Sequence, residues 1–452
     1  MIEILLTLLW TVLLAVGLRY LPFFKNIRGL PYKLLVILFL IKVLTGQAYA
    51  LIYTHYYDPQ TADIHRFFRD GKVLFSALKD NPLDYLRMLT GIGAGAEHLQ
   101  PYYTTMNDWF RPWLSPVYND NRIMIRFNAF MQLFSMGILQ VHVVMANFIS
   151  LAGFVALYKF AIRYLDPLKD KWLIPGLFLM PSVLFWSSGV IKETLLFPAM
   201  GFFLLATDRI IDKENRQPAL WLIMFAMLGL LLLLKAYTLF LLLPCYLAFR
   251  LALKQPPRLR WMAFPAVILV YVLLILVAGQ VFPQYNLIGM MAAKQTEFML
   301  FSLSVNVGSL IHEVYLQPTF TSIVSYLPRG LANTLFYPHL LDADSPVTMM
   351  AAAENILIFI VLAATLWHTF RNKNIHPLVW MGLWLTLITF TFVGTITQVS
   401  GGLVRYKIPA LPFLWMAFVS VMPAGLVEQK LTKWFPSMAG RFRIFHHKIF
   451  GT

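Results

Sequence analysis

Long apolar runs separated by short polar connections make up most of this 452-residue chain. Eleven runs approach the roughly 20 residues that a helix needs to cross a bilayer. The pattern therefore predicts an all-α, multi-pass integral membrane protein with about 11 transmembrane helices. The predicted spans are 3–23, 34–53, 134–158, 173–189, 191–208, 219–235, 237–252, 262–281, 352–369, 378–398 and 408–426.

The chain forms one predicted transmembrane domain, 1–452, with two long loops and a tail. The loops cover 54–133 and 282–350, and a basic, aromatic tail covers 428–452. Loops of this length in a compact protein are usually functional. We expect amphipathic helices in both loops, lying along the membrane surface.

The first loop has the clearest amphipathic pattern. Over 62–79, apolar residues recur at helical spacing and form one stripe, while six charged residues prevent this segment from spanning a bilayer. A second short helix is expected over 82–90. The glycine-rich stretch 91–96 (GIGAGA) should be a turn that resembles a phosphate-binding nest only weakly.

Composition narrows the class of protein further. Hydrophobic residues make up 59% of the chain and charged residues 13%, which excludes a soluble enzyme and a disordered or fibrous protein. The single cysteine, Cys245, excludes disulfides and a cysteine-based zinc site.

The chain carries a net charge of +16. The excess of Lys and Arg collects in alternate connections between predicted spans and in the tail, so it lies on one side, the cytoplasmic side. We therefore expect the N-terminus and both long loops outside, the C-terminus inside, and no nucleic-acid partner.

Several ionisable residues interrupt the apolar runs. A charge in lipid costs several kcal/mol, so such residues usually face the protein interior or a cavity. Together they would form a cationic pocket for an anionic lipid headgroup, in which Arg suits phosphate through its bidentate fork. The candidate lipid-phosphate ligands are Arg405, Lys235, Lys192 and Lys42.

A plainer interpretation stays open for each of these residues. Lys235 and Lys407 stand near span ends, where lysines reach the headgroups cheaply by snorkelling. Lys192 and Glu193 are neighbours and could form a local pair. Lys42 would be close to an interface if its span were shifted by one turn.

Asp63 is the candidate catalytic residue. It begins the amphipathic helix of the first loop, where a carboxylate could take a proton from an attacking hydroxyl at the membrane boundary. The alternative is structural, because Asp near a helix start often caps the helix, and Arg66 lies one turn on. Further candidate substrate contacts are His65, Arg66, Glu97, Glu193, Arg329 and Tyr406.

The second loop contains three acids that could bind a metal ion, with weaker support than the lipid-phosphate site. Asp342, Asp344 and Glu354 are carboxylates of the kind that Mg²⁺ or Mn²⁺ prefers, but their spacing matches no recognised cage. No cofactor is required by the sequence.

Three segments resemble the GT-C superfamily of membrane glycosyltransferases: TADIHRFF (61–68), FWSSGVIKETLLF (185–197) and GGLVRYKIPALPFL (401–414). The resemblance implies a bacterial enzyme that takes a sugar from a polyprenyl-phosphate carrier. It also implies that Asp63 is the general base and that Arg405 contacts the carrier phosphate. NRIMIRFNAFMQLFS (121–135) and the 185–197 segment are also similar to O-antigen polymerase-like surface-polysaccharide proteins.

Three hypotheses follow for function. The first is an inverting glycosyltransferase in the bacterial inner membrane, active on the outer face, whose acceptor is a glycan, a lipid or a protein. The second is a polysaccharide polymerase that joins diphosphate-linked repeat units. The third is a non-catalytic lipid or polysaccharide transport component, which would not depend on Asp63.

Overall fold

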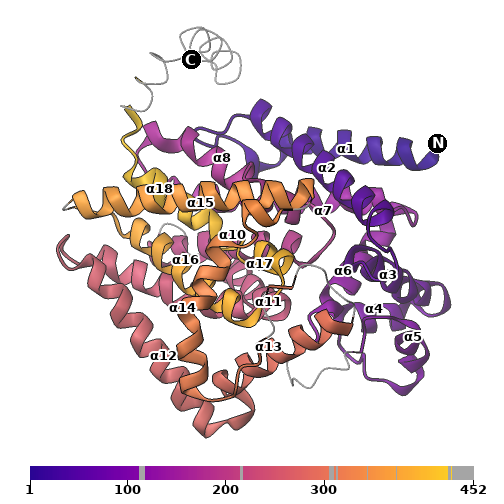
Figure 1. The fold of residues 1–452 in the computed structure, drawn as a ribbon. Helices are drawn as coiled ribbons and strands as arrows, with labels where there is room; N and C mark the ends of the chain where they lie inside the picture. Colours follow the sequence, from indigo (N-terminus) through magenta and orange to yellow (C-terminus); the bar gives the residue numbers. More distant parts are fainter. Residues whose placement is uncertain are drawn as a thin grey trace.

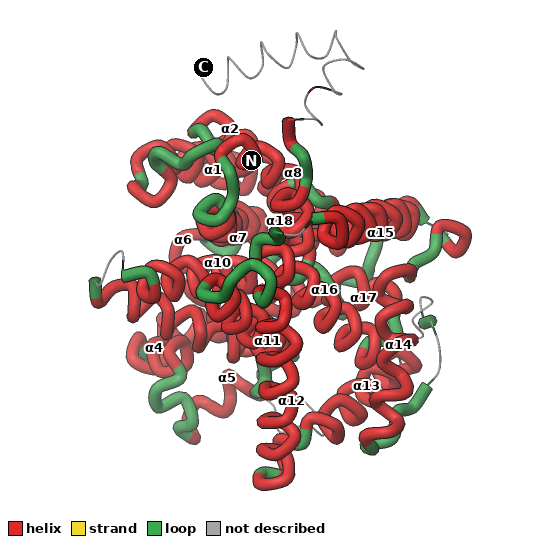
Figure 2. The backbone as a smooth tube through the Cα atoms, turned by 90° about the vertical axis from the view of Figure 1, so that its left-hand side faces the viewer, coloured by secondary structure: helices red, strands yellow, loops and turns green. Residues whose placement is uncertain are grey.

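The computed structural model describes residues 1–110, 118–213, 217–304, 310–311, 314–343, 345–372, 374–425 and 429. Within these residues every regular element is a helix, and the one β-type pairing is an isolated bridge between Leu310 and Val399. Figure 2 shows the described chain as helices and loops. The predicted all-α class is confirmed.

Eight helices in the described part of the chain are long and apolar enough to cross a membrane. They are α1 (Ile2–Tyr20), α2 (Tyr32–His55), α7 (Leu139–Ala161), α10 (Lys192–Ile211), α11 (Pro218–Leu253), α12 (Ala263–Val281), α15 (Pro346–Arg371) and α16 (Pro377–Ile396). A helical membrane protein is therefore supported, while the number 11 and the sidedness stay predictions.

Two predicted spans contain shorter helices. The range 173–189 holds α8 (Leu173–Phe178) and α9 (Pro181–Trp186), which are separated by Leu179 and Met180. The range 408–426 holds α18 (Leu411–Val421). These pieces are too short to span a bilayer alone.

Helix α11 contains the two predicted spans 219–235 and 237–252, and it reverses direction at Lys235. The backbone there is non-helical, with φ −153° and ψ 81°. Lys235 contacts Glu193 at the start of α10, and Arg250 contacts Asp212 just past its end. A straight helix would place Pro218 about 48 Å from Arg250. Pro218 follows Asp212 by six residues, a stretch that reaches about 22 Å at most, so both halves of α11 run beside α10.

The first loop folds as a separate group of helices at one side of the molecule (Figure 1). It contains α3 (Asp63–Asp80), α4 (Pro82–Thr90), α5 (Gln100–Thr105) and α6 (Asn121–Ser135). The predicted helices at 62–79 and 82–90 are therefore confirmed. The apolar stripe of α3 is buried, with Ile64 and Leu74 fully enclosed, and it packs mainly on α6.

The second loop contributes α13 (Leu287–Ser304) and α14 (Phe320–Phe336), and α17 (Ser400–Tyr406) follows α16. Helix α14 packs closely on α16, because Gly330 and Gly394 face one another without side chains between them. This contact brings the second loop against the short helix α17.

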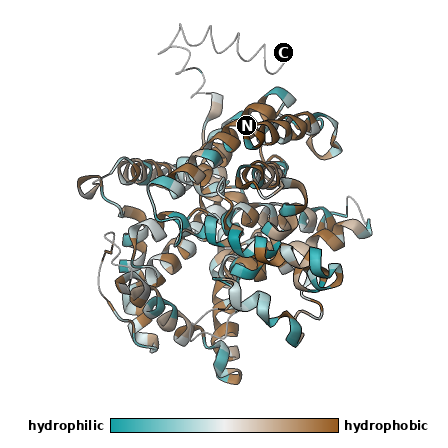
Figure 3. Cartoon of the chain, turned by 90° about the vertical axis from the view of Figure 1, so that its right-hand side faces the viewer, coloured by the Kyte–Doolittle hydropathy of each residue, from teal (hydrophilic) through white to brown (hydrophobic). Residues whose placement is uncertain are grey.

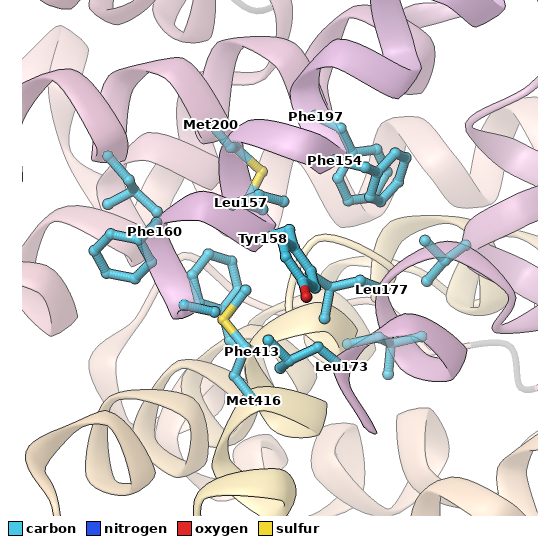
Figure 4. Close-up of a cluster of buried hydrophobic side chains, with 14 of the residues drawn as sticks. Phe154, Leu157, Tyr158, Phe160, Leu173, Leu177, Phe197, Met200, Phe413 and Met416 are labelled. Atoms are coloured by element: carbon cyan, nitrogen blue, oxygen red, sulfur yellow. The ribbon is translucent and has the colours of Figure 1, made fainter. Parts of the chain in front are cut away.

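The core lies around α7 and α10, and the outer helices expose apolar surface. Phe154 of α7 stacks on Phe197 of α10 with ring centroids 4.4 Å apart (Figure 4). In the apolar 18-residue stretch of each helix, 83% of the residues of α7 are buried, but only 6% of those of α1. Helix α1 is largely brown in Figure 3, the colour of hydrophobic residues. Its exposed apolar side chains fit contact with lipid.

The contact between α7 and α10 depends on Gly153, and Gly153→Ala should destabilise the protein. A Cβ at Gly153 would overlap the backbone of Pro198, which cannot yield as a flexible side chain does. We expect a loss of about 2 kcal/mol or more in unfolding free energy, because overpacking outweighs the gain in helix propensity.

Gly229→Ala in α11 is the matched control, since nothing lies within 4 Å of its new Cβ. Thermal unfolding of both variants in detergent measures the difference. Equal unfolding temperatures for the two variants would contradict this packing.

Candidate functional site

Arg405 of α17 joins three segments that are far apart in the sequence. Its Nε and Nη2 donate to Glu193 Oε1 and Oε2 over 2.7 and 2.9 Å. Its Nη1 donates to Asp63 Oδ2 over 3.0 Å. The guanidinium is thus held along one edge by α10 and reaches α3 with its other end.

Lys235 completes a group of four charges, which we call the Arg405 cluster: Arg405, Glu193, Lys235 and Asp63. Lys235 Nζ donates to Glu193 Oε1 over 2.5 Å. The Glu193 side chain is fully buried, and a buried carboxylate is stable only when it is paired and hydrogen-bonded. Two cations and two carboxylates balance, so the cluster is formally neutral.

Asp63 is the most exposed member of this cluster. Its side chain is 42% exposed, whereas that of Arg405 is 16% exposed. The cap position of α3 is Ala62, and no side chain caps that helix start. The capping role and the pair with Arg66 are therefore both wrong in this structure, because Asp63 pairs with Arg405.

A non-helical stretch between α9 and α10 carries the chain into Glu193. Its carbonyl groups are satisfied by side chains: Ser187 O accepts from Lys42 Nζ and Ser150 Oγ, and Ser188 O accepts from Asn147 Nδ2. Irregular backbone among membrane-spanning helices is tolerated where such partners exist. This arrangement fixes the start of α10.

Lys42 lies inside the protein at 2% exposure and contacts neutral oxygens, at 2.8 Å from Ser187 Oγ and 3.3 Å from Ser188 Oγ. It has no bond to the Arg405 cluster within the described residues. Its proposed contact with a lipid phosphate stays a prediction.

Two other lysines have partners that the local-pair and snorkelling interpretations did not include. Lys192 pairs with Asp120 at 2.7 Å and not with its neighbour Glu193. Lys407 is 1% exposed and donates to Asn355 Oδ1 over 2.5 Å. Snorkelling is therefore wrong for Lys407, and also for the buried, paired Lys235.

The loop after α5 places a further carboxylate near Asp63. Asp70 of α3 accepts the backbone N–H groups of Asn107 and Asp108 over 2.9 and 2.8 Å. Asp108 Oδ1 then pairs with Arg66 Nη2 at 2.8 Å. Asp108 Oδ2 is buried, without a hydrogen-bond partner among the described residues.

Burial raises the pKa of Asp108 to about 6. The negative charges of Asp70 and Asp63 act in the same direction, while Arg66 opposes them. A carboxyl group with this pKa exchanges its proton close to neutral pH, which is unusual outside functional sites.

The remaining candidate residues lie at various distances from the cluster. Tyr406 lies under Lys235, whose Nζ is 4.4 Å from the ring centroid. His65 bonds to Thr54 at 3.0 Å, and burial lowers its pKa. Glu97 and Arg329 are exposed, and neither has a hydrogen bond or ion pair to the cluster within the described part of the chain.

Of the three proposed metal ligands only Glu354 has a described side chain, so the metal site stays a prediction. No group of three His, Cys, Asp or Glu residues that could hold a metal ion is found among them. Glu354 accepts from the N–H and Oγ of Ser182, at 2.8 and 2.7 Å. Asp344 and the side chain of Asp342 lie outside the described residues.

No sequence pattern indicated the roles of Asp70, Asp108 and Asp120. Each is an ordinary loop or helix acid by composition, and its partner lies 37 or more residues away along the chain. Only the packing of α3, α6 and α10 brings these partners together.

No family model, curated protein or solved structure matches this chain. The structure therefore assigns the described residues only to a broad class. They form an all-helical protein whose apolar helices suit a membrane, with a buried charge cluster at one end of α10. The resemblance to GT-C glycosyltransferases stays a prediction from the three segments quoted above.

Glu193→Gln should strongly destabilise the protein, because it leaves Arg405 and Lys235 without their shared carboxylate. Breaking a buried ion pair from one side costs about 3–5 kcal/mol. Adding Lys235→Met should recover part of that loss by removing the uncompensated ammonium. Thermal unfolding in detergent is the measurement, with the exposed Glu97→Gln as the matched control. A Glu193→Gln variant as stable as the control would contradict the cluster.

Asp108→Asn should change how stability depends on pH. A raised carboxyl pKa means that the folded state holds the proton more tightly than the unfolded state. The contribution of Asp108 to the stability of the natural protein therefore falls as pH rises from about 4 to 6, by up to about 3 kcal/mol. The variant lacks this fall, so its stability relative to the natural protein should rise over that range. Unfolding temperatures across pH 4–8 test this, and a constant difference would contradict it.

Proposed function

We propose that this protein is a GT-C-like glycosyltransferase of the bacterial inner membrane, with about 11 transmembrane helices. It would move a sugar from a polyprenyl-phosphate carrier to an acceptor glycan, lipid or protein on the outer face. The observation that carries the proposal is the Asp63 carboxylate, 42% exposed and 3.0 Å from Arg405 Nη1.

The two ends of the Arg405 guanidinium have different partners, which supports this role. Glu193 occupies the Nε–Nη2 edge, so that edge positions the guanidinium. Nη1 points to the partly exposed Asp63, on the accessible side of the cluster. A lipid phosphate arriving at Nη1 would meet an arginine already fixed in place, which lowers the reorganisation needed for catalysis.

The proposed reaction is a single inverting displacement. Asp63 accepts the proton of the acceptor hydroxyl, whose oxygen forms a bond to the anomeric carbon of the sugar. The bond from that carbon to the carrier phosphate breaks, and its electron pair stays on the phosphate oxygen. Arg405 and Lys235 stabilise this developing negative charge, a task that a Mg²⁺ or Mn²⁺ ion would otherwise perform.

Asp63→Asn should reduce transfer by at least about a hundredfold while the protein stays folded, because the amide cannot accept the proton. The donor is first identified by native mass spectrometry of lipids that copurify with the protein. Transfer from that donor is then measured in nanodiscs. Asp58→Asn is the matched control, since it removes another exposed acid of the same loop.

The outcomes separate the three functional hypotheses. A bound polyprenyl monophosphate, with activity lost only in Asp63→Asn, supports the transferase. A diphosphate that carries an oligosaccharide indicates the polymerase instead. Full activity of Asp63→Asn contradicts the general-base role, and transport of the lipid without any dependence on Asp63 favours the transport component.

A further inference from the structure

A pair of arginines lies beside Trp109, the residue that follows Asp108. The guanidinium carbons of Arg122 and Arg126, both in α6, lie 4.9 and 5.5 Å from the ring centroid of Trp109. Tyr103 stacks on the same ring at 4.3 Å, with an angle of 3° between the ring planes. The two arginines therefore share the part of the Trp109 ring that Tyr103 leaves uncovered.

Each arginine is held in place by neutral acceptors. Arg122 Nε donates to Trp109 O over 2.9 Å. Arg126 Nε donates to Met88 O over 2.9 Å, and its Nη1 donates to Tyr118 Oη over 3.0 Å. These bonds fix both side chains but neutralise neither.

No carboxylate pairs with Arg122 or Arg126 in the part of the chain that the structure describes. Their remaining donors, Arg126 Nη2 and both Nη atoms of Arg122, have no hydrogen-bond partner there. Residues 111–117 contain no Asp or Glu in the sequence. Two adjacent guanidinium groups repel one another unless an anion lies between them, and their free donors fit a phosphate.

The glycine-rich turn after α4 leaves space beside these donors. Gly91 and Gly93 have positive φ values of +86° and +72°. A Cβ on Gly91 would lie 3.1 Å from Arg126 Nη2, so the absent side chain keeps that donor accessible. Because the N–H groups of Gly91 and Ile92 already donate to Arg87 O and Thr90 Oγ1, the turn contributes space and not donors.

We infer that Arg122, Arg126 and Trp109, together called the Trp109 site, bind a phosphate ester or diphosphate, for which Gly91 leaves space beside Arg126. The two guanidinium groups match the charge of such a dianion, and the indole ring keeps them side by side. The phosphate comes either from a lipid headgroup or from a water-soluble compound. This inference does not rest on the proposed transferase activity.

The test uses the full-length protein in phosphatidylcholine nanodiscs. In one arm, inorganic pyrophosphate and glycerol phosphate are titrated by calorimetry. In the other arm, phosphatidylglycerol is added to the nanodiscs, and native mass spectrometry counts the anionic lipids retained. Arg122→Gln and Arg126→Gln are compared with Arg371→Gln, which removes an arginine that stacks on Trp367 elsewhere. Arg122→Lys and Arg126→Lys keep the charge if the glutamine variants fail to fold.

We expect at least a tenfold loss of affinity in each glutamine variant, and no change in Arg371→Gln. The lysine variants should bind more weakly than the natural protein, because lysine lacks the bidentate fork. Binding in the first arm indicates a water-soluble phosphate, and retention of phosphatidylglycerol alone indicates a headgroup. Absence of binding in both arms, or equal binding by the glutamine variants, overturns the inference.

Discussion

The burial of one carboxylate, Glu193, is the constraint on which the site depends. Its side chain is fully enclosed, so it must be paired with cations that are themselves well bonded. Arg405 and Lys235 supply those bonds from α17 and from the reversal point of α11. These three elements therefore cannot separate without leaving a charge unpaired in a dry environment.

The opposite end of α10 repeats this solution, with one buried carboxylate between two cations. Asp208 is fully buried and accepts from Arg163, in the turn after α7, and from Arg250 of α11, at 2.7 and 2.6 Å. Helix α10 is thus held at both ends by ion pairs, while glycine-to-backbone packing holds its middle against α7. A helix fixed in this way is a rigid support for Glu193, and through Glu193 for Arg405.

A functional site needs one part that stays fixed and one part that substrate can reach. Glu193 and the bonded carbonyls before α10 belong to the fixed part, and Asp63 is the accessible part. Asp108 belongs to the same loop as Asp63. Its pKa is higher than that of an ordinary carboxyl group, because it is buried near other acids. In the proposed mechanism the first loop would therefore supply the group that accepts the proton, and the long helices would position the cations.

The sequence by itself determined the helical class, the long apolar helices and the amphipathic α3 and α4, because helical periodicity and apolar length are local properties. It also indicated Asp63, Arg405 and Lys235 as residues that need an explanation. The tertiary structure alone decided the partners. Asp63 meets Arg405 across 342 positions, and Lys192 meets Asp120 in preference to its own neighbour. Charges select partners by their separation in space, which the packing of distant helices sets and which no local spacing records.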